Sequence, residues 1–293
     1  MKPAPFDYVR PASLAEACAL LAADEDARLI AGGQTLVPML AMRLARPAKL
    51  IDILRLPELV GIREENGTIV VGATTRQAQA ERDPVIRASV PLLARVLQWV
   101  GHPSIRNRGT IGGSIANADP SAEIPLAAVT LGAEVLLATA QGERSVPADD
   151  LFIGAMLTTL EQGECIRAIR FHVWPHKRIG TGFFEISARR SDFAFVAAAA
   201  QVALDDEDRC IDIALGVGGI GDRPLRLDVS SLKGTKLDPV SVSDAVNAAS
   251  LELDASSDLH ASAAYRRRAA VTLGERALEQ ARANAAKSIG GAR

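Results

Sequence analysis

The sequence predicts an α+β protein in two parts: an N-terminal region made of two α/β subdomains, and a C-terminal α+β domain. The chain has 293 residues, which is enough for two domains with cores of their own. Short β-rich runs alternate with segments of helical periodicity. A polar segment at Pro175–Gly182, with proline, two glycines and basic residues, divides the chain. We expect domains at 1–177 and 178–286, and a disordered tail at 287–293.

The first elements lead to a Gly-Gly segment. Ser13 is placed to cap a helix whose apolar residues recur at helical spacing, namely Leu14, Ala17, Cys18 and Leu21. Arg28–Ala31 has the pattern of a short buried strand, and Leu36–Leu44 that of a helix. Ala31–Leu36 (AGGQTL) therefore lies where a strand passes into a helix, which gives a phosphate both loop amides and a helix N-terminus.

The rest of the N-terminal region mixes short strands and helices. Proline 91 is expected to break the helical stretch in which it lies, and Thr74 or Thr75 to cap the helix before it. Glu65–Gly67 has the pattern of a hairpin turn. The expected strands are Lys49–Ile53, Thr68–Val71, Ala133–Ala138 and Ile166–Phe171. Three helices are expected: one that ends at about Glu81, one over Asp83–Val100 and one over Ile124–Leu131.

The C-terminal domain is expected to contain an alanine-rich strand, a second strand and two helices. These lie at Phe183–Leu204, Ile211–Val217, Val240–Leu253 and Ser262–Ala285.

A second Gly-Gly pair lies in Ile105–Pro125 (IRNRGTIGGSIANADPSAEIP). Its polar run has no hydrophobic alternation and makes a poor strand and a poor helix. Glycines 112 and 113 can turn their N–H groups toward one point, and Thr110 and Ser114 add hydroxyl donors. A single Gly-Gly turn is more often only a turn. Two such segments on one chain, however, indicate a ligand with two adjacent phosphates, which is a dinucleotide.

The charged residues near this pair could contact the ligand or support the local structure. Asp119 precedes Pro120 and either caps a helix or contacts the ligand. Glu123 would be repelled by a pyrophosphate, so a sugar or a base is its better partner. Arg106 and Arg108 either steer phosphates or brace the loop by donating to its carbonyl groups.

A third glycine-rich segment, Gly216–Gly221, matches GxGxxG literally. A dinucleotide-binding Rossmann motif needs a helix directly after it, and here Asp222–Pro224 follows. We interpret the segment as a strand end that another backbone approaches closely.

Composition excludes several classes of protein. A formal charge of −2 argues against a nucleic-acid surface, and the basic run Arg266–Arg268 is expected to face solvent or a partner. Three single cysteines cannot hold an iron–sulfur cluster by a common pattern. Four unpaired histidines, among which only His102 lies near a glycine segment, offer no convincing base. No apolar run approaches 18 residues and the N-terminus lacks an apolar signal core, so the expected location is the cytoplasm.

The two glycine segments, with IGDRPLRL (Ile220–Leu227) and HASAAYRRRAA (His260–Ala270), resemble the FAD-binding medium subunit of the molybdenum hydroxylases, of the carbon monoxide dehydrogenase and xanthine dehydrogenase type. The resemblance covers nearly the whole chain. It implies a two-part FAD-binding fold of the PCMH or VAO-like kind, with noncovalent FAD whose pyrophosphate lies between the two segments.

The resemblance also assigns residues to the cofactor. An aromatic residue, usually tyrosine, lies near the isoalloxazine in carbon monoxide dehydrogenase relatives; this chain has Phe193, which keeps stacking and loses the hydroxyl, or is simply a core residue. Ile166 matches an apolar family position against the flavin, and Glu123 an acidic one. The expected FAD contacts are Ala31, Gly32, Gly33, Gln34, Thr35, Leu36, Thr110, Ile111, Gly112, Gly113, Ser114, Asn117, Asp119, Glu123, Ile166 and Phe193.

The implied function is electron transfer. In relatives, a large subunit oxidises substrate at a molybdenum cofactor, a small subunit carries two 2Fe–2S clusters, and FAD passes the electrons to an acceptor. The implied assembly is a dimer of heterotrimers without a membrane span. Three alternatives remain open: a free-standing FAD-dependent oxidase or dehydrogenase, a flavin-free binding or assembly module, and a peptidoglycan-precursor reductase with a similar FAD clamp.

Overall fold

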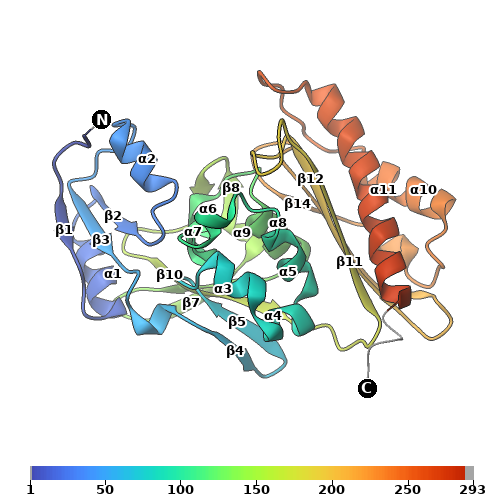
Figure 1. Ribbon diagram of the computed structural model, residues 1–293, viewed down its shortest axis with the longest axis horizontal. Helices are drawn as coiled ribbons and strands as arrows, with labels where there is room; N and C mark the ends of the chain where they lie inside the picture. The colour runs from blue at the N-terminus through green and yellow to red at the C-terminus, as the bar shows by residue number, and fades with distance from the viewer. Residues whose placement is uncertain (1, 288–293) are drawn as a thin grey trace.

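A computed structural model describes residues 2–287 of the chain, so the tail expected at 287–293 lies outside the described residues from 288 onward. Figure 1 shows three sheets in a row, from the blue N-terminal sheet to the C-terminal sheet beside the red α11. The first sheet is parallel, in the order β1-β3-β2. Its unit contains β1 (Asp7–Val9), α1 (Leu14–Ala22), β2 (Ala27–Ile30), α2 (Leu36–Ala41) and β3 (Lys49–Asp52).

Local sequence signals in this first unit are confirmed. The Ser13 hydroxyl accepts from the backbone N–H of Glu16 at 3.2 Å and caps α1. Its apolar face packs with Ile51 of β3 and Leu59 in one hydrophobic cluster. The short strand β2 ends at Ile30 and α2 begins at Leu36, so the first Gly-Gly segment connects a strand to a helix as expected.

The central unit has an antiparallel sheet in the order β4-β5-β10-β6-β7. Asn66 and Gly67 have φ of 48° and 74°, as the two central residues of the tight turn between β4 and β5 require. The strands are β4 (Ile62–Glu65), β5 (Thr68–Gly72), β6 (Glu134–Ala138), β7 (Glu143–Pro147) and β10 (Cys165–His172), and a hairpin of β8 (Phe152–Gly154) and β9 (Leu157–Thr158) follows β7.

Helices cover this sheet and supply most of the largest core cluster. The break expected at proline 91 is confirmed, because α4 ends at Ser89 and α5 begins at Pro91. The short helices are η1 (Pro57–Leu59), α3 (Gln77–Arg82), α4 (Pro84–Ser89), α5 (Pro91–Leu97), α6 (Pro103–Arg106), α7 (Ile111–Asn117), α8 (Glu123–Thr130) and α9 (Ala148–Leu151).

Two local predictions are wrong. The hydroxyls of Thr74 and Thr75 do not cap α3; they donate to the carbonyls of Leu59 and Gly61, because the chain there still packs against η1. The Gly-Gly block expected to be a poor helix lies in the first turn of α7, where Thr110 caps the N-terminus by accepting from Gly113 N–H at 3.1 Å.

The C-terminal domain is an antiparallel sheet, β11-β12-β13-β14, with α11 along one face and the central unit against the other (Figure 1). Positions 180 and 182 of β11 require glycine, because a Cβ at either position would overlap the backbone of α11. The elements are β11 (Ile179–Ile186), β12 (Val196–Leu204), β13 (Cys210–Gly218), β14 (Leu225–Leu227), η2 (Ser230–Leu232), α10 (Pro239–Ser250) and α11 (Ala263–Lys287).

The remaining glycine motif and basic run have structural roles. Gly216 lies near the end of β13, where a Cβ would overlap the Thr130 hydroxyl of α8, so close backbone approach explains the motif. Arg266 does not face solvent or a partner as expected. It is 4% exposed, and its guanidinium donates to the carbonyls of Phe195 and Gly219 and pairs with Asp258. No described helix is long and apolar enough to cross a lipid bilayer.

Candidate cofactor site

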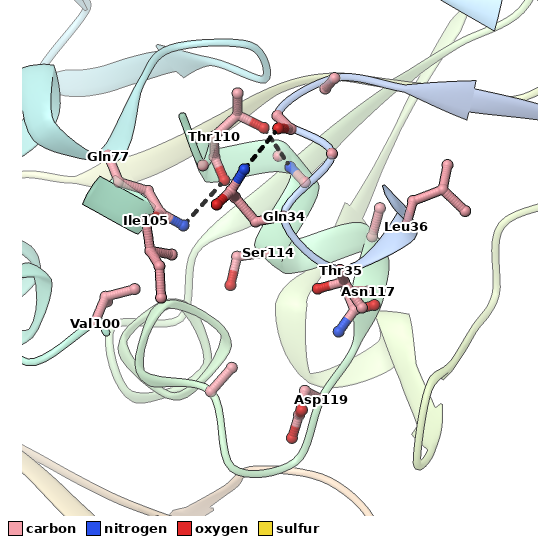
Figure 2. Close-up of a pocket in the computed structure, with 18 of the residues that line it drawn as sticks. Gln34, Thr35, Leu36, Gln77, Val100, Ile105, Thr110, Ser114, Asn117 and Asp119 are labelled. Atoms are coloured by element: carbon pink, nitrogen blue, oxygen red, sulfur yellow. Dashed lines mark hydrogen bonds between the residues drawn. The ribbon is translucent and has the colours of Figure 1, made fainter. Parts of the chain in front are cut away.

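A cavity of about 630 Å³ lies between the first Gly-Gly segment, the start of α7 and α8, and a loop of the C-terminal domain. Its volume is in the range of small-molecule and cofactor sites. Figure 2 shows side chains of the first Gly-Gly segment and of α7 facing one space, among them Thr35, Ser114 and Asn117. The site therefore draws on all three sheet-containing units.

The first Gly-Gly segment has donors to offer. Within the described residues, the backbone N–H groups from Gly32 to Leu36 donate to no other group, so they are available to an anion. Gly33 has φ of +71°, which favours glycine. A Cβ on Gly32 would lie 2.5 Å from the carbonyl oxygen of Arg108. Only glycine therefore lets this segment come so close to the second one.

The N–H groups at the second Gly-Gly pair do not point toward a ligand as the sequence suggests, because other groups of the chain accept from them. Ile111 N–H donates to Thr75 O at 3.0 Å, and Gly112 N–H donates to Ala73 O at 2.8 Å. The N–H groups of the next two residues, 113 and 114, donate to the hydroxyl and the carbonyl of Thr110. What this turn presents to the cavity is therefore the polar side chains of Ser114 and Asn117 and the exposed backbone of Gly113.

Residues of α3 and α6 and neighbouring side chains hold these two segments in place. Gln77 N–H donates to Gly109 O at 3.0 Å, and its side-chain amide to Thr110 O at 3.4 Å. The interpretation of Arg106 as a brace is confirmed, because it donates to the carbonyls of Val100 and Gly101 at 3.0 and 2.9 Å and pairs with Glu81. The carbonyl of Arg108 accepts from the guanidinium of Arg76.

Two acids line the far part of the cavity. Asp119 accepts from Ser121 N–H at 2.9 Å in a local turn and does not cap α8, whose N-cap is Ala122. Burial raises the pKa of Asp119. Glu123 is the first residue of α8, and burial, reinforced by the charge of Asp119, raises its pKa to about 7. Glu123 is thus poised between its charged and neutral forms near neutral pH.

The C-terminal domain closes one side of the cavity with Ser191–Phe193. Ser191 has φ of 74°, and the Ser187 hydroxyl donates to Arg189 O at 2.7 Å across the same turn. Phe193 is 72% exposed, so the reading of this residue as part of the core is wrong. An exposed ring on the cavity rim is available to a ligand or to another protein.

The residues expected from the sequence cluster around this cavity. With the exception of Ile111, which is fully buried in the core, every residue expected to contact FAD lines the cavity. Reasoning from motifs missed residues that reach the cavity only through the fold, such as Gln77 of α3, Ile53 after β3 and Cys165 of β10. Ile105, the first residue of the second segment, also lines the cavity, and no local sequence signal marks the others.

The fold and the cavity define a binding protein for an extended anionic cofactor. The chain matches the family "FAD binding domain in molybdopterin dehydrogenase" over residues 4–174 and "CO dehydrogenase flavoprotein C-terminal domain" over residues 182–281.

Curated relatives match this chain over nearly its whole length. The chain is 39% identical, over 96% of both chains, to the 6-hydroxypseudooxynicotine dehydrogenase complex subunit alpha of Paenarthrobacter nicotinovorans. It is 37% identical to the carbon monoxide dehydrogenase medium chain of Afipia carboxidovorans, over 97% of this chain and 99% of the relative. A solved carbon monoxide dehydrogenase from Hydrogenophaga pseudoflava superposes with a TM-score of 0.92 at 35% identity, covering 97% of this chain and 99% of that chain. The chain belongs to the FAD-binding medium subunits of the molybdenum hydroxylases.

It is thus an oxidoreductase subunit whose cofactor is FAD. The residues present fit this cofactor. The unused amides at Gly32–Leu36 suit a pyrophosphate. Apolar Ile105, Ile166 and Phe193 suit an aromatic ring system, and Glu123 suits a hydroxyl or amine donor.

Proposed function

We propose that this chain is the electron-transfer subunit of a heteromeric molybdenum hydroxylase, and that it carries electrons from iron–sulfur clusters of a partner subunit to an external acceptor. The observation that carries the proposal is an FAD cavity with an exposed aromatic residue, Phe193, on its rim. Bound FAD supplies the conversion between one-electron and two-electron transfer. The protein's part is to bind it, orient it and leave one side accessible.

The binding role falls to the two glycine segments. The amides at Gly32–Leu36 would hold the pyrophosphate, with the Ser114 hydroxyl and the Asn117 amide beside them. Hydrogen bonds to a charged group each contribute about 1.5–3 kcal/mol, so several of them retain the cofactor without a lysine. We assign Glu123 to a donor on the ribose or the adenine, away from the phosphates.

The donor of electrons must come from another chain. The sequence has three cysteines, which is one fewer than a common 2Fe–2S cluster requires. All three are buried, and burial raises the pKa of Cys210 to about 11. We therefore infer a small subunit with 2Fe–2S clusters and a large subunit with the molybdenum cofactor, assembled as a dimer of heterotrimers in the cytoplasm.

The rim of the cavity at Ser187–Phe193 is our candidate docking face for the small subunit. This turn is held internally, since Asp192 N–H donates to Arg189 O at 3.1 Å and Arg190 lies over the Trp99 ring at 6.0 Å. A turn ordered in this way can position a partner next to the cofactor.

The test is anaerobic stopped-flow at the flavin absorbance band. The purified chain with FAD should be inert toward aldehydes and N-heterocycles, and these substrates should bleach the flavin only after the small and large subunits of the complex are added. Rapid bleaching of the chain alone would instead establish a free-standing dehydrogenase. A chain that purifies colourless and takes up no FAD would contradict the cofactor assignment itself.

A further inference from the structure

Glu185 of β11 faces the central unit and not α11. Alternate residues of β11 point to opposite faces, and the glycines at 180 and 182 belong to the α11 face. Residues on the other face meet the central unit: the Thr181 hydroxyl accepts from Arg95 Nε at 2.8 Å, and the Phe183 ring lies 5.5 Å from that of Trp99. Glu185 continues this row, so its carboxyl group enters the interface between the two domains.

The carboxyl group of Glu185 has no hydrogen-bond partner there. Both of its oxygens are fully buried, and neither contacts a donor among the described residues. A buried, unpaired carboxylate is costly, and a neutral carboxylic acid avoids most of that cost. The surroundings of Glu185 therefore favour its protonated form.

The register of the sheet brings Glu185 toward Glu123. Glu185 pairs with Ala197 of β12, and Ala197 pairs with Gly218 of β13. Next to Gly218, Gly219 N–H donates to Pro120 O at 2.8 Å, which fixes the segment leading into α8 against this end of the sheet. The charge of Glu123 acts on Glu185, so the two carboxyl groups lie close together in this interface.

Two other charged groups act on Glu123 within the part of the chain that the structure describes. Asp119 acts on Glu123 from the turn before α8 and raises its pKa, and Arg106 opposes this effect from α6. Burial, reinforced by the charge of Glu123, raises the pKa of Glu185 to about 8. The two sites differ in geometry: Glu185 has both oxygens buried without a donor, whereas Glu123 lines the cavity in the first turn of α8, where the helix N-terminus favours a carboxylate.

We propose that Glu123 and Glu185 form a carboxylate–carboxylic acid pair in which Glu123, on the cavity wall, carries the charge and Glu185, behind it, holds the proton. Glu185 is then a positioning residue: it adds no second negative charge beside an anionic cofactor, and so lets Glu123 accept a hydrogen bond from FAD. The proposal rests on FAD as the cofactor and is independent of the electron-relay role.

A plot of FAD affinity against pH should then have a rising limb and a falling limb in the wild-type chain. It should rise by up to about tenfold per pH unit below pH 7, as Glu123 becomes the better acceptor, and fall above pH 8 as Glu185 loses its proton. The variant Glu185→Gln is neutral at every pH, so it should keep the first limb and lose the second. Glu64→Gln, at an exposed position of β4, is the control and should behave as wild type.

The measurement is FAD titration of the full chain by flavin fluorescence between pH 5.5 and 9.5. A Glu185→Gln profile that superposes on the wild-type profile would overturn the proposal. If the chain takes up no FAD at any pH, the cofactor assignment fails instead, and the two failures are thereby distinguished.

Infrared spectroscopy of the chain without added FAD gives a second test, which does not require Glu185→Gln to fold. At pH 7 the wild-type chain should show protonated carboxyl absorption that shifts in D₂O and includes a component, from Glu185, that titrates near pH 8. In Glu123→Gln the band should persist with a lower midpoint, because the neighbouring charge is gone. A wild-type chain without such a band, or a midpoint unchanged by Glu123→Gln, would refute the pair.

Discussion

The carbonyl oxygen of Arg108 lies against Gly32, so closely that a Cβ on Gly32 would come within 2.5 Å of it. This contact joins the two glycine segments backbone to backbone, although more than 70 residues separate them in the sequence. The same carbonyl accepts from the guanidinium of Arg76, so the contact point cannot move freely. The first subdomain is thereby held to the central unit at the place where the FAD pyrophosphate is proposed to bind.

Replacing Gly32 with valine should therefore separate the two segments. The new side chain would meet backbone atoms, which yield less readily than a flexible side chain, at a cost of about 1–3 kcal/mol. We expect FAD content to fall at least tenfold, measured by absorbance after desalting. Gly142→Ala is the matched control, since nothing lies within 4 Å of a Cβ at that turn position. Equal flavin content in the two variants would contradict the proposed role of the contact.

The assignment of Glu123 to the adenosine half of FAD predicts a selective loss. Glu123→Ala should weaken FAD binding by about 1–3 kcal/mol, the cost of a lost hydrogen bond to a charged group. FMN lacks the adenosine, so its affinity should change little. Isothermal titration with both flavins, with Glu64→Ala as the surface control, checks this. Equal losses for FMN and FAD would place the contact elsewhere on the cofactor.

The raised pKa of Glu185 predicts how its replacement changes stability with pH. In the unfolded chain a glutamic acid ionises near about pH 4.3, whereas in the folded chain Glu185 keeps its proton until about pH 8. Between these values the folded state binds more protons than the unfolded state, so this group makes the protein less stable as pH rises.

Glu185→Gln removes this penalty, so the variant should gain stability relative to wild type as pH rises, by at most about 1.4 kcal/mol per pH unit between pH 4.3 and 8. Urea unfolding at pH 5 and pH 8 measures the difference. A stability difference that does not vary with pH would mean that Glu185 has an ordinary pKa.

Local signals in the sequence were sufficient for much of the fold. The Ser13 cap, the break before Pro91 and the turn at Asn66–Gly67 each depend on chemistry within four or five residues. The glycine segments were recognisable for the same reason, since a positive φ or a close backbone contact leaves few residues other than glycine.

Features that depend on packing between distant segments were not predictable. Helix α7 forms in spite of two glycines, because Thr110 caps it and Gly112 fits against Ala73, the residue after β5. The isolation of Glu185 follows from strand register and from α8 lying across the sheet. Arg266 is one of three consecutive arginines, and only the positions of Phe195 and Gly219 explain why it is the buried one.

Phe193 offers the sharpest test of where the isoalloxazine lies. Because its ring is 72% exposed, Phe193→Ala should change stability by no more than about 0.5 kcal/mol. If the ring stacks on the flavin, as we propose, its removal should raise the fluorescence of bound FAD while flavin content is kept, and Phe193→Tyr should restore the quenching. Ile153→Ala removes a comparably exposed apolar side chain, from the β8–β9 hairpin, and should leave the fluorescence unchanged. If Phe193→Ala and Ile153→Ala emit alike, Phe193 does not stack on the flavin and the proposed docking face beside it loses its main support.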